Sequence, residues 1–298
     1  MTDLSEFFIA GQRLAAPPLA PGLYVVATPI GNLRDITIRA LETLSAAALI
    51  LCEDTRMSAR LLDHYGIRTQ RKSLHEHNEH ARVAEIAQRI ADGQAIALIS
   101  DAGTPLLSDP GFPLVRALRE ADLPVFAVPG ASALLAGLAI AGLPTDAFGF
   151  VGFLPVKAGA KTAALTALKS RPDTLVFYES PRRIAPTLAA MAEVLGPDRE
   201  AVVALELTKR FERSFRGPLS DLAGRFAAED ETKGEIVILV AGADKSAPVD
   251  DADWQAALAE ALETAPLRIA VDAITEKFSL KRKQVYDAAL ALKAAKEP

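Results

Sequence analysis

Short apolar runs alternate with helical segments over residues 22–241, and this alternation limits the fold more than any other feature of the sequence. In the first half, apolar runs lie at 23–30, 49–54, 95–100 and 125–128, each followed by turn residues and then by a segment with helical spacing. Such alternation predicts a mainly parallel sheet whose two faces are covered by helices.

A second alternation begins after the turn residues around position 145, so we expect two α/β domains followed by a small helical extension. The second set of strands is predicted at 148–154, 174–179, 201–208 and 236–241, and a further strand at 211–216 would make this sheet mixed. The expected divisions are an N-terminal tail (1–21), a first α/β domain (22–144), a second α/β domain (145–243), a linker (244–252) and a helical extension (253–298).

Basic residues are concentrated in this extension. From Pro266 onward there are seven lysines and arginines against four acidic residues, whereas the whole chain has a formal charge of −5. A helix–turn–helix with a basic edge and an ordinary solvated helical face both explain this pattern, and the first would contact RNA. Ser279 is expected to cap a last helix at about 280–293.

Composition places the chain among globular proteins, with 50% apolar and 24% charged residues. Its one cysteine, Cys52, excludes an internal disulfide and suits a reducing compartment. The first 20 residues lack the basic region of a signal peptide, and the apolar stretch at 131–143 is too short to span a bilayer. We therefore expect a cytoplasmic protein with no membrane partner.

The segment SDAGTPLLSDPG at 100–111 is the most informative motif, because an apolar strand leads directly into it. Ligands of open parallel sheets bind at the carboxyl ends of strands, where the Asp101 carboxylate and the loop amides would face them. A rigid surface turn is an equally good explanation for the loop alone. A second strand end at 128–133 opens a helix that Ser132 can cap. The chain has no Gly-x-Gly-x-x-Gly and no P-loop motif, which disfavours those nucleotide-binding folds.

Three further polar clusters follow predicted strands, at 52–56, 75–80 and 178–183. The middle cluster contains His75, His77 and His80, but this spacing and the lack of supporting cysteines disfavour a metal site. We expect no metal, and interpret the cluster as a solvated loop or a substrate contact.

Six motifs that occur in one order resemble those of the tetrapyrrole methylase superfamily: TPIGNLRDIT (28–37), CEDTR (52–56), SDAGTPLLSDPG (100–111), PGASA (129–133), FYESPRR (177–183) and LTKRFE (207–212). The resemblance is greatest to the branch that methylates a cytidine ribose 2′-hydroxyl in 16S ribosomal RNA of the small subunit. Ser100-Asp101-Ala102 stands where porphyrin-type members usually have Gly-Asp-Pro, which favours the RNA branch over a tetrapyrrole substrate.

The resemblance implies a homodimer of two-domain chains that bind S-adenosylmethionine (SAM) in the cleft between the domains. Carried over motif by motif, the implied cofactor contacts are Pro29, Asp101, Thr104, Ser132, Ala133, Tyr178, Gly234 and Glu235. The implied RNA contacts are Arg56, Arg182 and Arg183 as phosphate ligands, together with Lys281, Arg282 and Lys283 in the basic extension.

Methyl transfer to a ribose hydroxyl needs a group that accepts the hydroxyl proton. The catalytic candidates are Asp54, Glu179, Glu53 and Lys209, with Glu206, His75 and His77 as further possibilities, and Asp54 or Glu179 is favoured. Pairing of Asp54 with Arg56 and of Glu179 with Arg182 in salt bridges is an equally good explanation of these residues. Two other functions stay open, a tetrapyrrole methyltransferase and a noncatalytic ribosome-binding protein.

Overall fold

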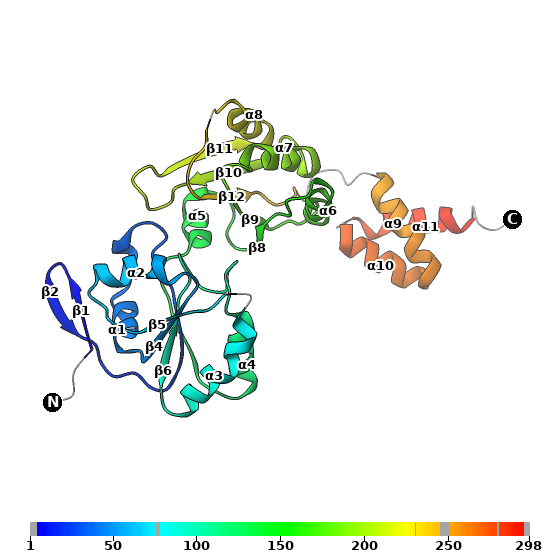
Figure 1. The fold of residues 1–298 in the computed structure, drawn as a ribbon. Coiled ribbons are helices and arrows are strands. Elements are labelled where there is room, and N and C mark those ends of the chain that lie inside the picture. Colours follow the sequence, from blue (N-terminus) through cyan, green and yellow to red (C-terminus); the bar gives the residue numbers. More distant parts are fainter. Residues whose placement is uncertain (1–4, 76–77, 230, 245–250, 279, 295–298) are drawn as a thin grey trace. The chain divides into compact units, whose positions relative to one another are not determined.

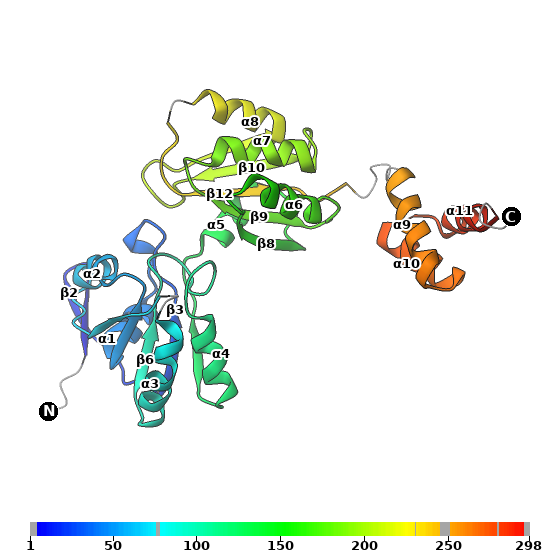
Figure 2. The same cartoon turned by 45° about the vertical axis from the view of Figure 1, so that its right-hand side comes forward.

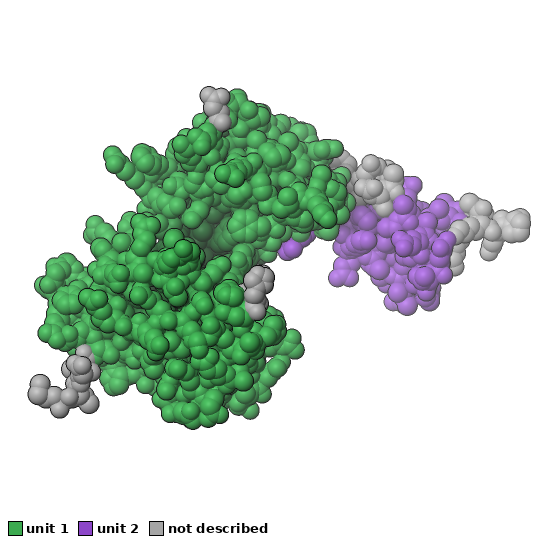
Figure 3. Space-filling model, viewed as in Figure 1, with its two compact units in different colours: residues 1–169, 173–241 green, residues 170–172, 242–298 purple. Residues whose placement is uncertain are grey.

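A computed structural model describes residues 5–75, 78–229, 231–244, 251–278 and 280–294. The chain divides into two compact units, coloured separately in Figure 3. Unit 1 comprises residues 1–169 and 173–241, and unit 2 comprises residues 170–172 and 242–298. Both predicted α/β domains belong to unit 1, so they form two halves of one compact body.

The first half of unit 1 is built on a five-stranded parallel sheet (Figure 1). Its central strands at 49–52 and 95–98 are fully buried because helices cover both faces, as the apolar runs predict. In spatial order the strands are β5 (Arg71–Ser73), β4 (Leu49–Cys52), β6 (Ala95–Leu98), β3 (Gly22–Val26) and β7 (Val125–Val128).

Helices α1 (Ile38–Ala46) and α2 (Thr55–His64) pack on one face of this sheet, and a short 3-10 helix, η1 (Leu33–Asp35), precedes them. Helices α3 (Glu79–Ala91) and α4 (Phe112–Glu120) pack on the other face. Both pairs place apolar side chains towards the strands, which gives the half its two hydrophobic cores.

Part of the segment expected as a tail is structured. Strands β1 (Glu6–Ile9) and β2 (Gln12–Ala15) form an antiparallel hairpin, and Phe7 is 1% exposed in the core beside α1. The expectation of a simple tail over 1–21 is therefore wrong for these residues. A short alternating strand with one buried aromatic residue is too weak a pattern to distinguish from an irregular terminus.

The second half contains a mixed five-stranded sheet, in which β8 and β9 are parallel and the remaining neighbours are antiparallel. Its spatial order is β11 (Arg213–Pro218), β10 (Glu200–Leu205), β12 (Ile236–Val240), β9 (Thr174–Glu179) and β8 (Phe148–Phe153). Helices α6 (Ala158–Leu168), α7 (Ile184–Leu195) and α8 (Leu219–Ala228) cover one face (Figure 2). The additional strand expected near 211–216 is β11.

Helix α5 (Ala133–Ala141) covers the other face of this second sheet, although it follows β7 of the first sheet. Its Leu134 and Leu138 pack with Val237 and Leu239 of β12. At Gly137 an added Cβ would lie 3.1 Å from a Val237 methyl, so the glycine lets the helix approach the strand closely. The boundary placed at residue 145 from turn residues falls after this helix, whereas its packing partners lie in the second half.

Unit 2 contains three helices in its described residues, α9 (Asp251–Thr264), α10 (Leu267–Phe278) and α11 (Arg282–Ala294). They pack around Trp254, which is 2% exposed and contacts an apolar cluster that includes Val271 and Val285. Ser279, the expected cap of α11, lies outside the described residues. Within the described residues, no helix is long and apolar enough to cross a membrane. The predicted fold class, two α/β parts with a helical extension, is confirmed.

Candidate active site

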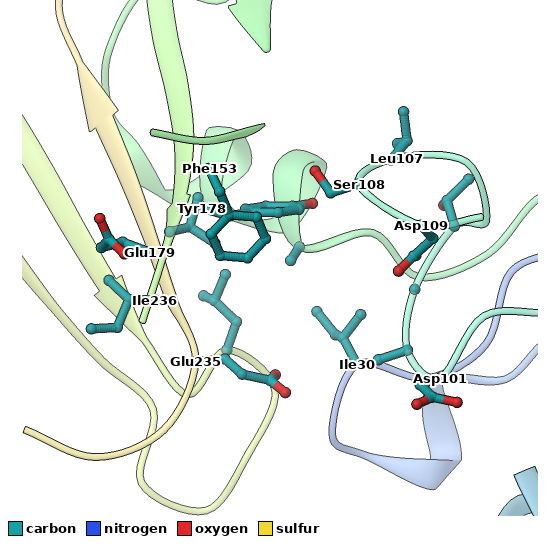
Figure 4. Close-up of a pocket in the computed structure, with 16 residues that line it drawn as sticks. Ile30, Asp101, Leu107, Ser108, Asp109, Phe153, Tyr178, Glu179, Glu235 and Ile236 are labelled. Atoms are coloured by element: carbon teal, nitrogen blue, oxygen red, sulfur yellow. The ribbon is translucent and has the colours of Figure 1, made fainter. Parts of the chain in front are cut away.

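Loops at the carboxyl end of the first sheet and strand ends of the second sheet line a cavity of about 240 Å³ in unit 1 (Figure 4). One wall comes from the 101–109 loop together with Ile30 and Ala133, and the facing wall comes from β8, β9 and the start of β12. The lining residues are Ile30, Asp101, Ala102, Gly103, Thr104, Leu107, Ser108, Asp109, Ala133, Phe153, Tyr178, Glu179, Leu207, Glu235, Ile236 and Val237.

Three sequence motifs meet at the first wall. Thr28 and Gly103 exchange backbone hydrogen bonds of 2.8 and 3.0 Å, which joins the loop after β3 to the loop after β6. Gly103 has a φ of +79°, a conformation that favours glycine. The Thr104 hydroxyl donates to the Ala131 carbonyl at 3.2 Å and so attaches the PGASA motif. Parallel strands therefore bring segments 75 residues apart in sequence to one edge, as in other open α/β sheets.

The facing wall is aromatic. Tyr178 lies edge-on to Phe150 and Phe153, with ring centroids 4.9 and 5.8 Å away, and its ring reaches into the cavity (Figure 4). The backbone N–H of Leu134, in the first turn of α5, donates to the Tyr178 hydroxyl at 3.2 Å. Burial raises the pKa of Tyr178, so the phenol stays protonated at neutral pH.

Carboxylates give the cavity a negative character. Asp101, Asp109 and Glu235 all line it, and Asp101 also accepts a 3.2 Å hydrogen bond from the backbone N–H of Asp54. The pKa of Asp109 is raised to about 6, mainly by burial and also by nearby Glu53 and Asp101, while a hydrogen bond with Ser100 opposes the shift. A cationic ligand would be favoured here over an anionic one.

Five of the eight residues expected to contact a cofactor line the cavity: Asp101, Thr104, Ala133, Tyr178 and Glu235. Pro29, Ser132 and Gly234 are adjacent in sequence to lining residues but do not line it themselves. The Ser132 hydroxyl instead accepts from the Leu135 N–H at 3.5 Å and caps α5.

The four catalytic candidates are in different environments. Glu179 lines the cavity and is 3% exposed, whereas Glu53 and Asp54 lie outside the lining. The Asp54 carboxylate caps α2 and pairs with Arg56 at 3.0 Å, an interaction that lowers the pKa of Asp54.

Lys209 also lies outside the lining, and its Nζ is 2.8 Å from Glu206 and 3.2 Å from Glu235. Partial burial lowers the pKa of Lys209, but these two carboxylates outweigh that effect and leave the pKa raised. A protonated lysine is a donor and does not accept a proton from a hydroxyl.

The expected RNA-binding arginines are not equivalent. The Arg56 side chain is 90% exposed, and Arg182 lines a separate groove beside α8. Arg183 is mostly buried: it donates to the Leu154 carbonyl at 2.6 Å and pairs with Glu179 at 3.3 Å. Arg183 therefore takes the structural role that the sequence had suggested for Arg182. Glu179 ends β9 and Arg183 immediately precedes α7, so the turn between these two elements brings the paired side chains together.

Unit 2 exposes the basic residues expected there. Lys281, Arg282 and Lys283 lie at the start of α11, and Arg282 pairs with Asp272 at 2.8 Å. Among the described residues, no group of three or more His, Cys, Asp or Glu side chains is arranged to hold a metal ion. The ring of His75 contacts the Asn78 amide at 3.0 Å, and His77 lies outside the described residues.

Sequence reasoning missed Asp109 as a candidate site residue. The residue is part of the SDPG end of the quoted 100–111 motif, and the signal available was its place in that motif. Its partial burial and its neighbouring carboxylates, Glu53 and Asp101, become visible only when the chain is folded.

The fold and the motifs define a methylase of the tetrapyrrole type. Residues 22–223 match the family of Tetrapyrrole (Corrin/Porphyrin) Methylases, and residues 248–293 match the RsmI C-terminal HTH domain. The chain belongs to the tetrapyrrole methylase family, and the resemblance seen in the sequence is confirmed.

Curated relatives carry a more particular name. Ribosomal RNA small subunit methyltransferase I of Mesorhizobium japonicum is 53% identical over 81% of this chain and 84% of its own length. The Haemophilus influenzae protein of the same name is 45% identical over 90% of this chain and 96% of its own length. A crystal structure of the Thermus thermophilus uroporphyrin-III C-methyltransferase, complexed with S-adenosylhomocysteine, has a TM-score of 0.51 at 20% identity. The match covers 74% of this chain and 97% of the chain in that crystal structure, and the two chains share the same fold.

Proposed function

We propose that this chain transfers a methyl group from SAM to the 2′-hydroxyl of a cytidine ribose in 16S ribosomal RNA. The cavity between the two halves of unit 1 carries this proposal, because it is lined by residues of the motifs that resemble those of the tetrapyrrole methylase family. We further propose that the enzyme acts in the cytoplasm as a homodimer on the assembling or assembled small subunit.

The lining residues fit this cofactor. SAM supplies an electrophilic methyl group on a positively charged sulfur and also carries a cationic amino group. The cavity offers the carboxylates of Asp101 and Glu235 to these charges. Ile30, Leu107 and Phe153 provide apolar surface for the nucleoside part.

The chain's own residues would position the reactants. Backbone hydrogen bonds between Thr28 and Gly103 hold the wall that carries Asp101. The Tyr178 hydroxyl accepts a hydrogen bond from the first turn of α5 and so connects β9 to that helix. The apolar and aromatic walls exclude water from the reacting atoms, so fixed orientation supplies much of the acceleration. This arrangement suits an in-line methyl transfer.

Basic residues outside the cavity would hold the RNA. Arg56 and Arg182 are exposed in unit 1, and Lys281 and Lys283 are exposed in unit 2, whose sequence matches an HTH family. Each lysine or arginine that contacts a phosphate contributes about 0.7–0.9 to the slope of log affinity against log salt. A Lys281→Ala/Lys283→Ala double variant is therefore expected to bind RNA more weakly and with a smaller salt slope.

The first experiment is calorimetric titration with SAM of the full chain and of Asp101→Ala. Asp63→Ala is the matched control, because Asp63 is exposed on α2 and does not line the cavity. Saturable binding that Asp101→Ala weakens at least tenfold, and Asp63→Ala leaves unchanged, is expected. Wild-type protein that fails to bind SAM with or without RNA would contradict the methyltransferase function and favour a noncatalytic RNA-binding protein.

The second experiment separates the substrates. 16S rRNA and isolated small subunits are incubated with the enzyme and methyl-labelled SAM, and ribose methylation is read as resistance to alkaline cleavage at one cytidine. Transfer to one of these RNAs supports the proposal, whereas transfer only to a tetrapyrrole contradicts it.

Sedimentation velocity tests the dimer, which should have twice the mass of one chain.

A further inference from the structure

The proposed reaction needs a group that accepts the proton of the ribose hydroxyl. The best acceptor in a protein cavity is an ionised carboxylate whose oxygens face the substrate and are not fully used by internal donors. Several carboxylates lie in or near the cavity, and their hydrogen bonds distinguish them.

Both carboxylate oxygens of Glu179 already have partners within the protein. Its Oε1 accepts from the Ser180 N–H at 2.7 Å and lies 3.3 Å from Arg183 Nε, while Oε2 accepts from the Thr187 hydroxyl at 2.7 Å. The side chain is 1% exposed, and its carboxylate points away from the aromatic rings in Figure 4. These contacts fix the end of β9 against α7, which makes Glu179 a structural residue.

The remaining candidates are poorly placed or already paired. Asp54 pairs with Arg56 outside the lining, and Glu53 does not line the cavity either. Glu235 has a side chain that is 70% exposed and pairs with Lys209 at 3.2 Å. Asp101 is exposed at the cavity mouth and accepts from the Asp54 N–H.

Asp109 differs from all of these. Its carboxylate lines the cavity, and Figure 4 shows it on the wall opposite the Tyr178 ring. Glu53 and Asp101 raise the pKa of Asp109 electrostatically, and Asp109 raises the pKa of Tyr178 in the same way. None of these three interacting groups is a cation. A side-chain hydrogen bond with Ser100 favours the ionised form of Asp109. A proton that reaches Asp109 therefore relieves repulsion between carboxylates.

The loop that carries Asp109 has a strained backbone conformation. Leu106 and Ser108 have φ values of +74° and +70°, which side chains other than glycine rarely adopt. The Gly111 N–H donates to the buried carboxylate of Glu79 at 2.8 Å, and Leu107 packs in the core beneath α5. Backbone strain of this kind persists where the surrounding structure fixes it, and it is concentrated at functional sites.

We propose that Asp109 is the catalytic proton acceptor of the methyl transfer, an inference that rests on the proposed function. As the ribose oxygen forms its bond to the methyl carbon, the carbon–sulfur bond breaks and its electron pair stays on sulfur, which becomes neutral. The hydroxyl proton passes to the Asp109 carboxylate, so charge and atoms balance. The raised pKa matches this role, because a base that titrates near 6 is ionised at neutral pH and more basic than an ordinary aspartate.

The test compares Asp109→Asn with Asp146→Asn, a matched change at an exposed aspartate outside the cavity. Single-turnover methylation by Asp109→Asn should fall about 10²–10⁴-fold, and the rise in rate through pH 6 should disappear. SAM affinity of Asp109→Asn should stay within about threefold of wild type, because a proton acceptor is not needed for cofactor binding. The control should match wild type in all three measurements.

Carboxyl ¹³C NMR of the protein without cofactor gives a readout that does not depend on activity. One aspartate resonance should titrate near pH 6 in wild type and in Asp146→Asn and be absent in Asp109→Asn. No such resonance in wild type would overturn the assignment, as would a variant rate within threefold of wild type. A more than tenfold loss of SAM affinity would make Asp109 a cofactor ligand instead. Wild-type protein that binds SAM but methylates no ribose would refute the proposed function itself.

Discussion

Replacement of Thr187 by valine tests the buried polar network behind the cavity. The Thr187 hydroxyl is fully buried, accepts from Lys161 Nζ at 3.0 Å and donates to Glu179 Oε2 at 2.7 Å. Valine has nearly the same shape, so Thr187→Val removes both hydrogen bonds without creating a cavity. Lys161 and Glu179 would stay buried, at 8% and 3% exposure, with one partner fewer each.

The expected loss of stability follows from these contacts. A hydrogen bond to a charged group contributes about 1.5–3 kcal/mol, and the other partners of Glu179 remain, so we expect a loss of about 3 kcal/mol from unit 1. A loss of this size lowers the Tm of a unit of this length by about 6–12 °C. The fold should otherwise be unchanged.

The chain allows unit 1 and unit 2 to be followed separately. Its one tryptophan, Trp254, lies in the core of unit 2, so tryptophan fluorescence in urea reports that unit, while far-UV circular dichroism reports both. Thr166→Val is the control, because Thr166 is exposed on α6 and its hydroxyl only donates to the Thr162 carbonyl. A loss below about 1 kcal/mol for Thr187→Val, or an equal shift of the Trp254 transition, would refute the reasoning.

Two further predictions concern packing and pH. Gly137→Val should destabilise unit 1 by about 1–3 kcal/mol in urea titrations, because the added side chain meets Val237. Gly224→Val in α8, where an added Cβ meets nothing within 4 Å, should be nearly neutral, and equal effects would contradict the packing argument.

The Lys209 hydrogen bond lowers the pKa of Glu206, so this pair stabilises the fold above the normal glutamate pKa and loses that effect as pH falls through the lowered value. Lys209→Met should therefore flatten the fall of Tm between about pH 5 and 3, and a steeper acid limb would contradict it.

The strands and most helices follow from the sequence because their patterns are local. Strand β9 has the predicted bounds, since buried strands are short apolar runs. Strand β10 ends at Leu205, before the predicted end at 208, because Glu206 and Thr208 have positive φ. The loop they form places Lys209 over Gly31, where a Cβ would overlap the lysine side chain. No local sequence pattern predicts such a contact.

The candidate site was partly visible in the sequence. Asp101 and Tyr178 lie in motifs that follow strands, and the ends of strands are where such folds bind ligands. The roles of acidic residues were not visible, because the sequence alone did not choose between Asp54 and Glu179 as proton acceptor. Each of these carboxylates already accepts hydrogen bonds from donors within the protein, and those hydrogen bonds form only in the folded chain.

By itself the sequence determined the α/β class, the helical extension and the family, because these depend on periodicity and on motifs read along the chain. Only the tertiary structure decided that α5 packs on the second sheet, that Arg183 rather than Arg182 pairs with Glu179, and that Asp109 faces the cavity. Burial and electrostatic environment arise from residues distant in sequence that pack together. A carboxylate's chemistry is therefore a property of the fold around it rather than of its neighbours in the chain.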